Sequence, residues 1–310
     1  MPDLFRPLTP LTPLTPSAPR AALRRCAVAI AGLAAMLATA APNESQATEP
    51  VDLELVLAVD VSGSIDPTEA KLQREGYQRA LTNPDVIAAI KSGPLGKIAL
   101  SYAEWAGMGH FKVVVDWQVI DSLDSAKAFI DRLTEVPVEN AHRTSLSDAI
   151  TYSVRHLAGN AFEGTRSIVD ISGDGANNFG RLVIEARDEA VAQGFIINGL
   201  PILTQSPTAG TYPSIPNLDL FFRDCVIGGP GAFYVAAHGF EDFARAVKKK
   251  LILEIAGIAQ PDQQRADAPR TGTAQLWLAQ SAQREPRESP PCNIGEWRWM
   301  SIIQGGTSDR

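Results

Sequence analysis

Three side chains that carry oxygen follow one another at alternate positions in one short segment. They are Asp60, Ser62 and Ser64, and they come directly after an apolar run that ends at Val59. Alternate side chains of an extended segment point to the same side, so one carboxylate and two hydroxyls converge there. Gly63, between the two serines, allows a tight backbone turn. The segment is therefore suited to holding a ligand by oxygen atoms.

Two further segments carry the same kinds of side chain. Asp174 lies between two glycines after an apolar run that ends at Ile171, and Thr144 comes just before a helical pattern. The three segments together supply two carboxylates and three hydroxyls. Few carboxylates with neutral oxygens suit a hard dication that keeps some of its water. We therefore expect Mg²⁺ first, and then Mn²⁺ or Ca²⁺.

Alternating strand and helix patterns must position these segments. Continuous apolar runs predict buried strands, and apolar residues four apart predict helices. Asp66, Pro67 and Glu69 form a helix start with a capping box. The predicted strands are 51–61, 97–105, 112–117, 167–171, 195–203 and 232–236, and the predicted helices are 66–82, 84–90, 122–133, 145–157, 181–193 and 240–255.

This order of elements predicts an α/β fold of the Rossmann type. The expected architecture is a doubly wound, mostly parallel sheet with helices on both faces. The turn from Gly107 to Gly109 predicts a hairpin, and therefore one antiparallel edge strand. In such sheets ligands bind beyond the carboxyl ends of the strands, where the strand order reverses. Asp60 and Asp174 both fall at predicted strand ends of this kind.

Residues 1–47 have the layout of a secretory signal peptide with an extended n-region. Arg24 and Arg25 precede an apolar run from Cys26 to Ala41. This run is shorter than the roughly 20 residues that span a bilayer. Patterns of small residues that suit cleavage by a signal peptidase occur near its end and after it. We expect an exported protein, periplasmic or secreted. The alternative is an anchor in the membrane through an uncleaved N-terminus.

The chain that remains after such cleavage is acidic and holds two cysteines. The whole sequence carries a net charge of −7, and without residues 1–47 the charge is −9. A phosphate-binding surface needs a basic patch, so no nucleic acid partner is expected. Cys225 and Cys292 either pair in an oxidising compartment or stay free. Residues 257–310 lack sustained periodicity and predict a low-order C-terminal tail, with one short docking helix near 273–283.

Other polar residues favour simpler interpretations. Asp170 lies within a predicted strand, where a satisfied buried carboxylate is expected rather than a ligand. Glu104 and Trp105 end the second predicted strand near the same edge, where edge-strand packing is expected and a role in the site is the alternative. The four histidines show no zinc-like spacing. A hydrolytic triad built on Ser62 and His142 lacks the Gly-x-Ser-x-Gly context of a nucleophile elbow.

The segment from Asp60 to Ser64 resembles the Asp-x-Ser-x-Ser motif of von Willebrand factor A (integrin I-type) domains. Within that group, segments 57–66, 171–175 and 225–233 resemble most closely the bacterial DUF1194 family, and the resemblance covers about residues 50–256. In these domains a metal-ion-dependent adhesion site (MIDAS) adds a Thr from a second loop and an Asp from a third. The metal ligands that the resemblance implies are Asp60, Ser62, Ser64, Thr144 and Asp174.

The second loop departs from the pattern of the family. His142 and Arg143 stand where many members have glycines, so Ser145 competes with Thr144 for the hydroxyl position. Together, the resemblance and the sequence patterns predict three parts of the chain. They are a signal peptide with n-region at 1–47, a domain like von Willebrand factor A at 48–256, and the tail at 257–310.

Two functions from different classes follow from the resemblance. The first is a binding module that uses its metal to hold a carboxylate of a protein partner. The alternative is an enzyme, either a metal-assisted hydrolase or an accessory subunit of a metal-inserting or ATPase complex. A binding module needs no base beside the metal, and the sequence supplies none by its spacing. The sequence also contains no P-loop motif, which disfavours ATP use by this chain alone.

Overall fold

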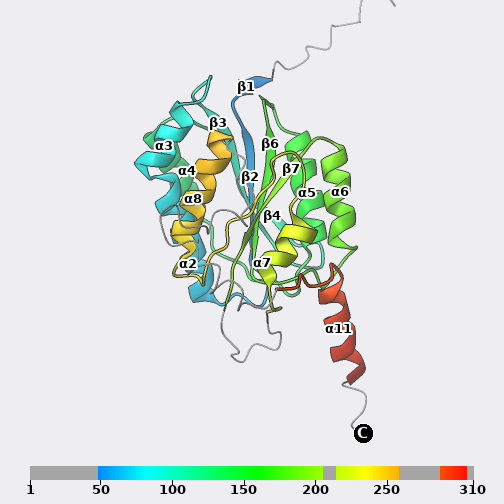
Figure 1. Cartoon of the computed structure of the whole chain (residues 1–310). Helices are drawn as coiled ribbons and strands as arrows, with labels where there is room; N and C mark the ends of the chain where they lie inside the picture. Colours follow the sequence, from blue (N-terminus) through cyan, green and yellow to red (C-terminus); the bar gives the residue numbers. More distant parts are fainter. Residues whose placement is uncertain (1–47, 205–213, 258–286, 306–310) are drawn as a thin grey trace, which may run out of the picture. The chain divides into compact units, whose positions relative to one another are not determined.

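A computed structural model describes residues 48–204, 214–257 and 287–305, so the predicted signal peptide lies outside the described residues (Figure 1). Within these ranges five strands form one sheet in the order β4-β3-β2-β6-β7. The β3–β4 pair is antiparallel and the other pairs are parallel. The strands are β2 (Glu54–Asp60), β3 (Ile98–Trp105), β4 (Phe111–Ile120), β6 (Ser167–Gly173) and β7 (Ile196–Pro201), and an additional parallel pair is formed by β1 (Glu49–Val51) and β5 (Phe162–Gly164).

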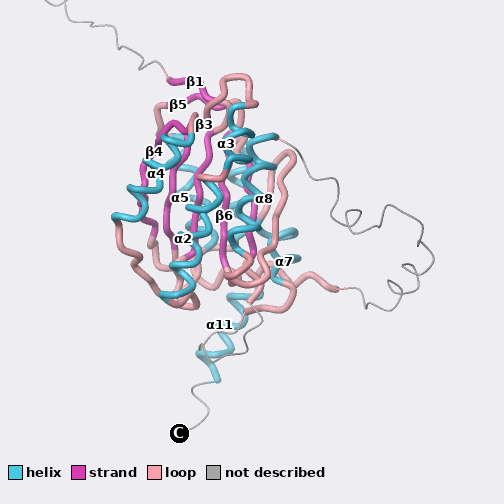
Figure 2. The backbone as a smooth tube through the Cα atoms, turned by 90° about the vertical axis from the view of Figure 1, so that its left-hand side faces the viewer, coloured by secondary structure: helices cyan, strands magenta, loops and turns pink. Residues whose placement is uncertain are grey.

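Helices cover both faces of the sheet (Figures 1 and 2). One face carries α2 (Pro67–Leu81), α3 (Pro84–Lys91), α4 (Leu123–Glu135) and α8 (Phe243–Ala256). The other carries α5 (Leu146–Ala158), α6 (Val183–Ala192) and α7 (Leu218–Phe221), which continues into the π-helical turn η1 (Phe222–Val226). This arrangement confirms the predicted α/β fold, with β4 as its one antiparallel edge strand.

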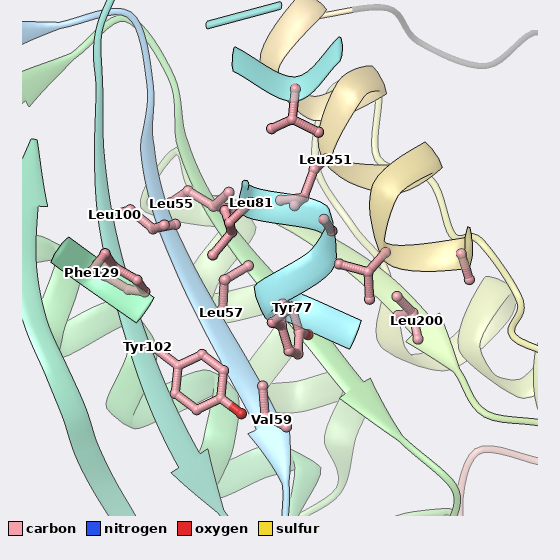
Figure 3. Close-up of a cluster of buried hydrophobic side chains, with 14 of the residues drawn as sticks. Leu55, Leu57, Val59, Tyr77, Leu81, Leu100, Tyr102, Phe129, Leu200 and Leu251 are labelled. Atoms are coloured by element: carbon pink, nitrogen blue, oxygen red, sulfur yellow. The ribbon is translucent and has the colours of Figure 1, made fainter. Parts of the chain in front are cut away.

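Strand β2 is buried along its whole length because helices cover the sheet on both sides. Its odd-numbered apolar residues, from Leu55 to Val59, join the core under α2 and α8 (Figure 3). Its even-numbered residues Val56 and Ala58 join the core under α5 and α6. The first polar side chain after this apolar run, Asp60, therefore emerges at the carboxyl end of a rigid central strand.

The predicted start of α2 is confirmed in detail. Asp66 accepts hydrogen bonds from the backbone N–H groups of Thr68 (2.7 Å) and Glu69 (2.9 Å), and the Glu69 carboxylate accepts one from the backbone N–H of Asp66 (2.9 Å). Pro67 occupies the first turn, where its missing N–H costs no hydrogen bond. This capping box holds the loop between β2 and α2.

The predicted strand at 232–236 is wrong. The segment does run beside β7, where Gly199 N–H donates to the Phe233 carbonyl (3.0 Å) and Val235 N–H donates to the Gly199 carbonyl (3.0 Å). The next donor in this register would come from Pro201, which has no N–H. The ladder therefore breaks into isolated bridges.

The C-terminal region contains a helix that the sequence did not predict, α11 (Ile294–Gly305). The helix that was predicted at 273–283 lies outside the described residues. Cys225, in η1, forms a disulfide with Cys292 just before α11, and their Cα atoms are 5.4 Å apart. This bond holds the end of the tail to the α/β domain. Among the described helices, none has the length and apolarity to cross a membrane.

Candidate metal centre

The first loop of the candidate site is held by its own polar groups. Asp60 is the last residue of β2, and its Oδ1 accepts a hydrogen bond from the backbone N–H of Ser62 (2.7 Å). The hydroxyls of Ser62 and Ser64 are 3.1 Å apart. The alternate side chains of this segment therefore point to the same side, as their spacing predicted.

The third loop reaches the first through a direct hydrogen bond. Asp174 follows the last residue of β6, and its Oδ1 accepts a hydrogen bond from Ser64 Oγ (2.7 Å). β2 and β6 are parallel neighbours, so their carboxyl ends meet at the same edge of the sheet. The two carboxylates predicted from separate segments thus lie in one site.

The second loop is bound to both of the others by its backbone. Ala141 N–H donates to the Val61 carbonyl (3.1 Å) in the first loop. In the third loop Asn178 accepts a hydrogen bond from Thr144 N–H through its Oδ1 (3.0 Å) and donates its own backbone N–H to the Thr144 carbonyl (2.9 Å). A Cβ atom built on Gly175 would lie 3.8 Å from Thr144 Oγ1 and 4.0 Å from its Cγ2, so the Thr144 side chain faces the third loop.

Thr144 and Ser145 differ in what their hydroxyls do. Ser145 Oγ accepts a hydrogen bond from Asp148 N–H (3.2 Å) as the N-cap of α5, and it lies 3.3 Å from Ser147 Oγ. Its oxygen therefore serves the start of the helix. The orientation of Thr144 toward Gly175 favours Thr144 as the second-loop member of the site.

Substitution of the two hydroxyl residues separates these roles. Thr144→Ala is expected to weaken Mg²⁺ binding without abolishing it, because water can replace a neutral ligand. Ser145→Ala is expected to keep the Mg²⁺ affinity and to lower the free energy of unfolding by about 1 kcal/mol through the lost N-cap. Calorimetric Mg²⁺ titration and urea unfolding measure the two effects. A loss of Mg²⁺ affinity in Ser145→Ala alone would assign the ligand role to Ser145.

The electrostatics of the site fit a bound cation. Asp60 is fully buried, and its Oδ2 has no hydrogen-bond partner among the described residues. Burial and the charge of Asp174 raise the pKa of Asp60 well above its ordinary value, and burial raises the pKa of Asp174. A Cβ atom on Gly173 would lie 3.0 Å from Asp60 Oδ2, so the absence of a side chain there leaves room beside this oxygen. A dication would neutralise both carboxylates and supply the missing partner.

The donor set restricts which ion would fit. No group of three His, Cys, Asp or Glu side chains forms a metal-binding cluster in the described part of the chain. The candidate site therefore offers two carboxylates, and the other donors are hydroxyls. This all-oxygen set with few charges matches Mg²⁺, Mn²⁺ or Ca²⁺ better than a soft transition metal.

Two other polar residues near this edge, Glu104 and Trp105, are buried, and Glu104 Oε2 and Trp105 Nε1 have no hydrogen-bond partner among the described residues. Glu104 forms an ion pair with Arg74 (2.7 Å), which also donates to the carbonyls of Leu133 (3.1 Å) and Val136. Trp105 is fully buried, and its ring lies on the same side of Gly173 as Asp60 Oδ2. Both residues thus pack at the end of β3, which lies between β4 and β2 and is therefore not the edge strand that was expected.

The hydrogen bonds of the described residues do not link Ser62 and His142 into a hydrolytic triad. Ser62 Oγ lies against Ser64, and no hydrogen bond joins it to His142 in the described ranges. A serine–histidine contact exists elsewhere, between Ser101 Oγ and His156 Nε2 (2.8 Å). That hydroxyl is fully buried and donates to the Val115 carbonyl (2.9 Å), so it holds β3 to β4.

Helix α11 contacts two of the three loops, which the sequence did not predict. Glu296 Oε1 accepts a hydrogen bond from Asn177 Nδ2 (2.7 Å) in the third loop. The ring of Trp299 lies 4.0 Å from the guanidinium carbon of Arg143, directly before Thr144. The pair of cysteines was the only sequence signal for this contact, because the disulfide from Cys292 to Cys225 brings the start of α11 to the domain.

Comparisons with known proteins agree with the resemblance seen in the motifs. The model of a family described as "Protein of unknown function (DUF1194)" matches residues 50–259. No curated protein matches the chain at a significant level.

Several solved structures resemble the chain at low identity. A structure of proximal thread matrix protein 1 from the mussel byssus is 14% identical, with a TM-score of 0.46 over 67% of this chain and 47% of that one. The pilus adhesin SpaC from Lactobacillus rhamnosus GG is 13% identical, with a TM-score of 0.49 over 67% of this chain and 31% of that one. A von Willebrand factor type A protein from Catenulispora acidiphila is 10% identical, with a TM-score of 0.46 over 66% and 43%. The chain thus spans less than half the length of these proteins.

Proposed function

The chain belongs to the DUF1194 family, and from this premise we propose that it is an exported binding module that uses a MIDAS-type divalent cation to capture an acidic group of a protein partner. The observation that carries this proposal is the buried pair Asp60 and Asp174, with one carboxylate oxygen that has no partner among the described residues. Such a pair is unfavourable by itself and becomes favourable around a cation.

Each residue of the site has a separate task in this proposal. Asp60 and Asp174 would hold the ion by charge, and the hydroxyls of Ser62, Ser64 and Thr144 would complete its oxygen shell. The hydroxyls add no charge, so the two carboxylates at most neutralise a dication. When bound, the cation supplies a coordination position at which a carboxylate from outside replaces water. No base is required for such capture, and the hydrogen bonds between the loops keep the donors in place.

The disulfide supports the proposed export. Structural disulfides persist in oxidising compartments and are rare in the cytosol. The Cys225–Cys292 bond therefore fits a periplasmic or secreted protein, as does the pattern of residues 1–47.

Retention of envelope proteins on the immobilised chain tests the function. The proposal predicts a partner that is retained with Mg²⁺, released by EDTA and not retained by Asp60→Ala with Mg²⁺. Asp131→Ala is the matched control, since Asp131 is an exposed aspartate on α4 and should retain the partner. Addition of excess acetate should weaken retention by competing for the cation. Retention that is indifferent both to EDTA and to Asp60→Ala would overturn the proposal.

A further inference from the structure

A second group of charged side chains lies in the interior, away from the candidate metal centre. Lys250 on α8 is fully buried, and Asp170 on β6 and Glu254 on α8 are each 1% exposed. The surrounding residues belong to the apolar core between the sheet and α2 and α8, of which Leu200 and Leu251 are labelled in Figure 3. One amine and two carboxyl groups are thus enclosed in the core.

Lys250 and Asp170 are in close contact. Lys250 Nζ lies 2.6 Å from Asp170 Oδ1. Nevertheless neither carboxylate oxygen of Asp170 has a hydrogen-bond partner among the described residues. The amine therefore touches the carboxyl group without lying along a hydrogen-bond direction. The carboxyl carbon is one bond away from Oδ1, so the amine lies close to the atom that a nucleophile would attack.

Glu254 completes a set of groups able to move protons. Its Oε1 accepts hydrogen bonds from Lys250 Nζ and from Asn198 Nδ2 (2.9 Å). Asn198 is in turn fixed by Phe233 N–H, which donates to its Oδ1 (3.0 Å). Burial and the charge of Asp170 raise the pKa of Glu254 to about 7, although Lys250 and Asn198 act to lower it. Glu254 is therefore held against the amine and can exchange a proton near neutral pH.

We propose that Lys250 and Asp170 react with each other to form an intramolecular isopeptide bond between α8 and β6. Lys250 Nζ attacks Asp170 Cγ, the Nζ–Cγ bond forms, and one Cγ–O bond breaks. The departing oxygen takes the two protons that the ammonium group loses and leaves as water. The ammonium–carboxylate pair thus becomes a neutral amide, and no oxidant or other reactant is needed.

Glu254 acts as the proton carrier of this reaction. It accepts a proton from Nζ, returns it to the departing oxygen, and ends in its original protonation state. The reaction is favoured in this core because an enclosed ion pair carries a desolvation cost that the neutral amide does not have. The product ties the last helix of the α/β domain to a central strand by a covalent bond. Such a bond would act independently of the metal centre.

The intact mass of the exported full chain tests the proposal. The N-terminus is first determined by sequencing, and the protein is reduced and alkylated so that the disulfide adds no mass change. The expected mass is lower than the sequence mass by one water molecule. A proteolytic digest should then contain one linked pair of peptides, one with Lys250 and the other with Asp170. A wild-type mass equal to the sequence mass would overturn the proposal, whether or not any variant folds.

Matched variants identify the bond and its carrier. Lys250→Arg and Glu254→Gln should each show the full mass of their own sequence, whereas Lys249→Arg, at an exposed neighbouring position, should still lack one water. Loss of ammonia in place of water would point to Asn198 as the acceptor and overturn the assignment to Asp170. Loss of water that the digest places at Asp174-Gly175, where a cyclic imide can form, would also overturn it.

Discussion

Saturating Mg²⁺ is expected to raise the melting temperature of the wild-type protein and to leave that of Asp60→Asn nearly unchanged. The substitution keeps the shape of the side chain but removes one of the two carboxylates, and neutral oxygens compete poorly with water for Mg²⁺. A ligand at about a hundred times its Kd stabilises the folded state by about 2.7 kcal/mol. For a domain of this size that corresponds to a shift of about 5–10 °C. Calorimetric titration and thermal melts measure affinity and stability together.

The metal-free protein provides a second readout through pH. The pKa values of Asp60 and Asp174 are raised in the folded state, mainly by burial. Carboxyl groups of this kind stabilise the folded state at pH values below their pKa in the unfolded chain, which is about 4. This contribution to the free energy of unfolding is lost as pH rises from that value through the higher pKa of the folded state. The wild-type free energy of unfolding should therefore fall over this window, and Asp60→Asn should reduce the slope.

The pH series also carries its own control. Mg²⁺ binds the ionised carboxylates, so its stabilising effect on the wild type should grow as pH rises over the same window. Asp131→Asn, an exposed substitution on α4, should behave like wild type in every measurement. Equal Mg²⁺ shifts in the wild type and in Asp60→Asn would place any metal elsewhere, and the proposed capture mechanism would lose its basis.

Lys250→Met is expected to lower the free energy of unfolding by about 3–5 kcal/mol. The substitution prevents the proposed bond and leaves Asp170 and Glu254 buried as free carboxyl groups, without the lysine that contacts both of them. The adjacent Lys249 is exposed, and Lys249→Met should change stability by no more than about 0.5 kcal/mol. Equilibrium unfolding in urea compares the two variants at equal side-chain volume.

A second substitution separates lost charge from lost packing. If the uncompensated carboxylates cause the loss, adding Glu254→Gln to Lys250→Met should restore part of the stability, because one buried charge is removed. Equal effects of Lys250→Met and Lys249→Met would contradict the expectation, since they would mean that the buried Lys250 contributes nothing to the stability of the fold.

The sequence alone predicted the part of the site that depends on local order. Asp60, Ser62 and Ser64 were placed on one side of a loop because alternate positions of an extended segment point the same way. The capping box at Asp66 and the glycines around Asp174 were also local signals. Parallel strands meet at their carboxyl ends, so the joining of the first and third loops followed from the fold class. The convergence of the two carboxylates was therefore predictable from local patterns and the order of the elements.

Only the tertiary structure decided the features that depend on partners distant in the sequence. The preference for Thr144 over Ser145 depends on Gly175 in the third loop, which the Thr144 side chain faces. The strand predicted at 232–236 failed because its neighbour in register is Pro201, and no local pattern reveals a neighbour.

The same holds for the interior and for the tail. Lys250 follows two other lysines in the sequence, yet it is buried against Asp170 on another element. Helix α11 lacks a periodic apolar face and is held by the Cys225–Cys292 bond and by contacts to the site loops. Periodicity reports the environment of a side chain averaged along one element. A buried charge or a docked segment is instead stabilised by particular partners that only folding brings to it.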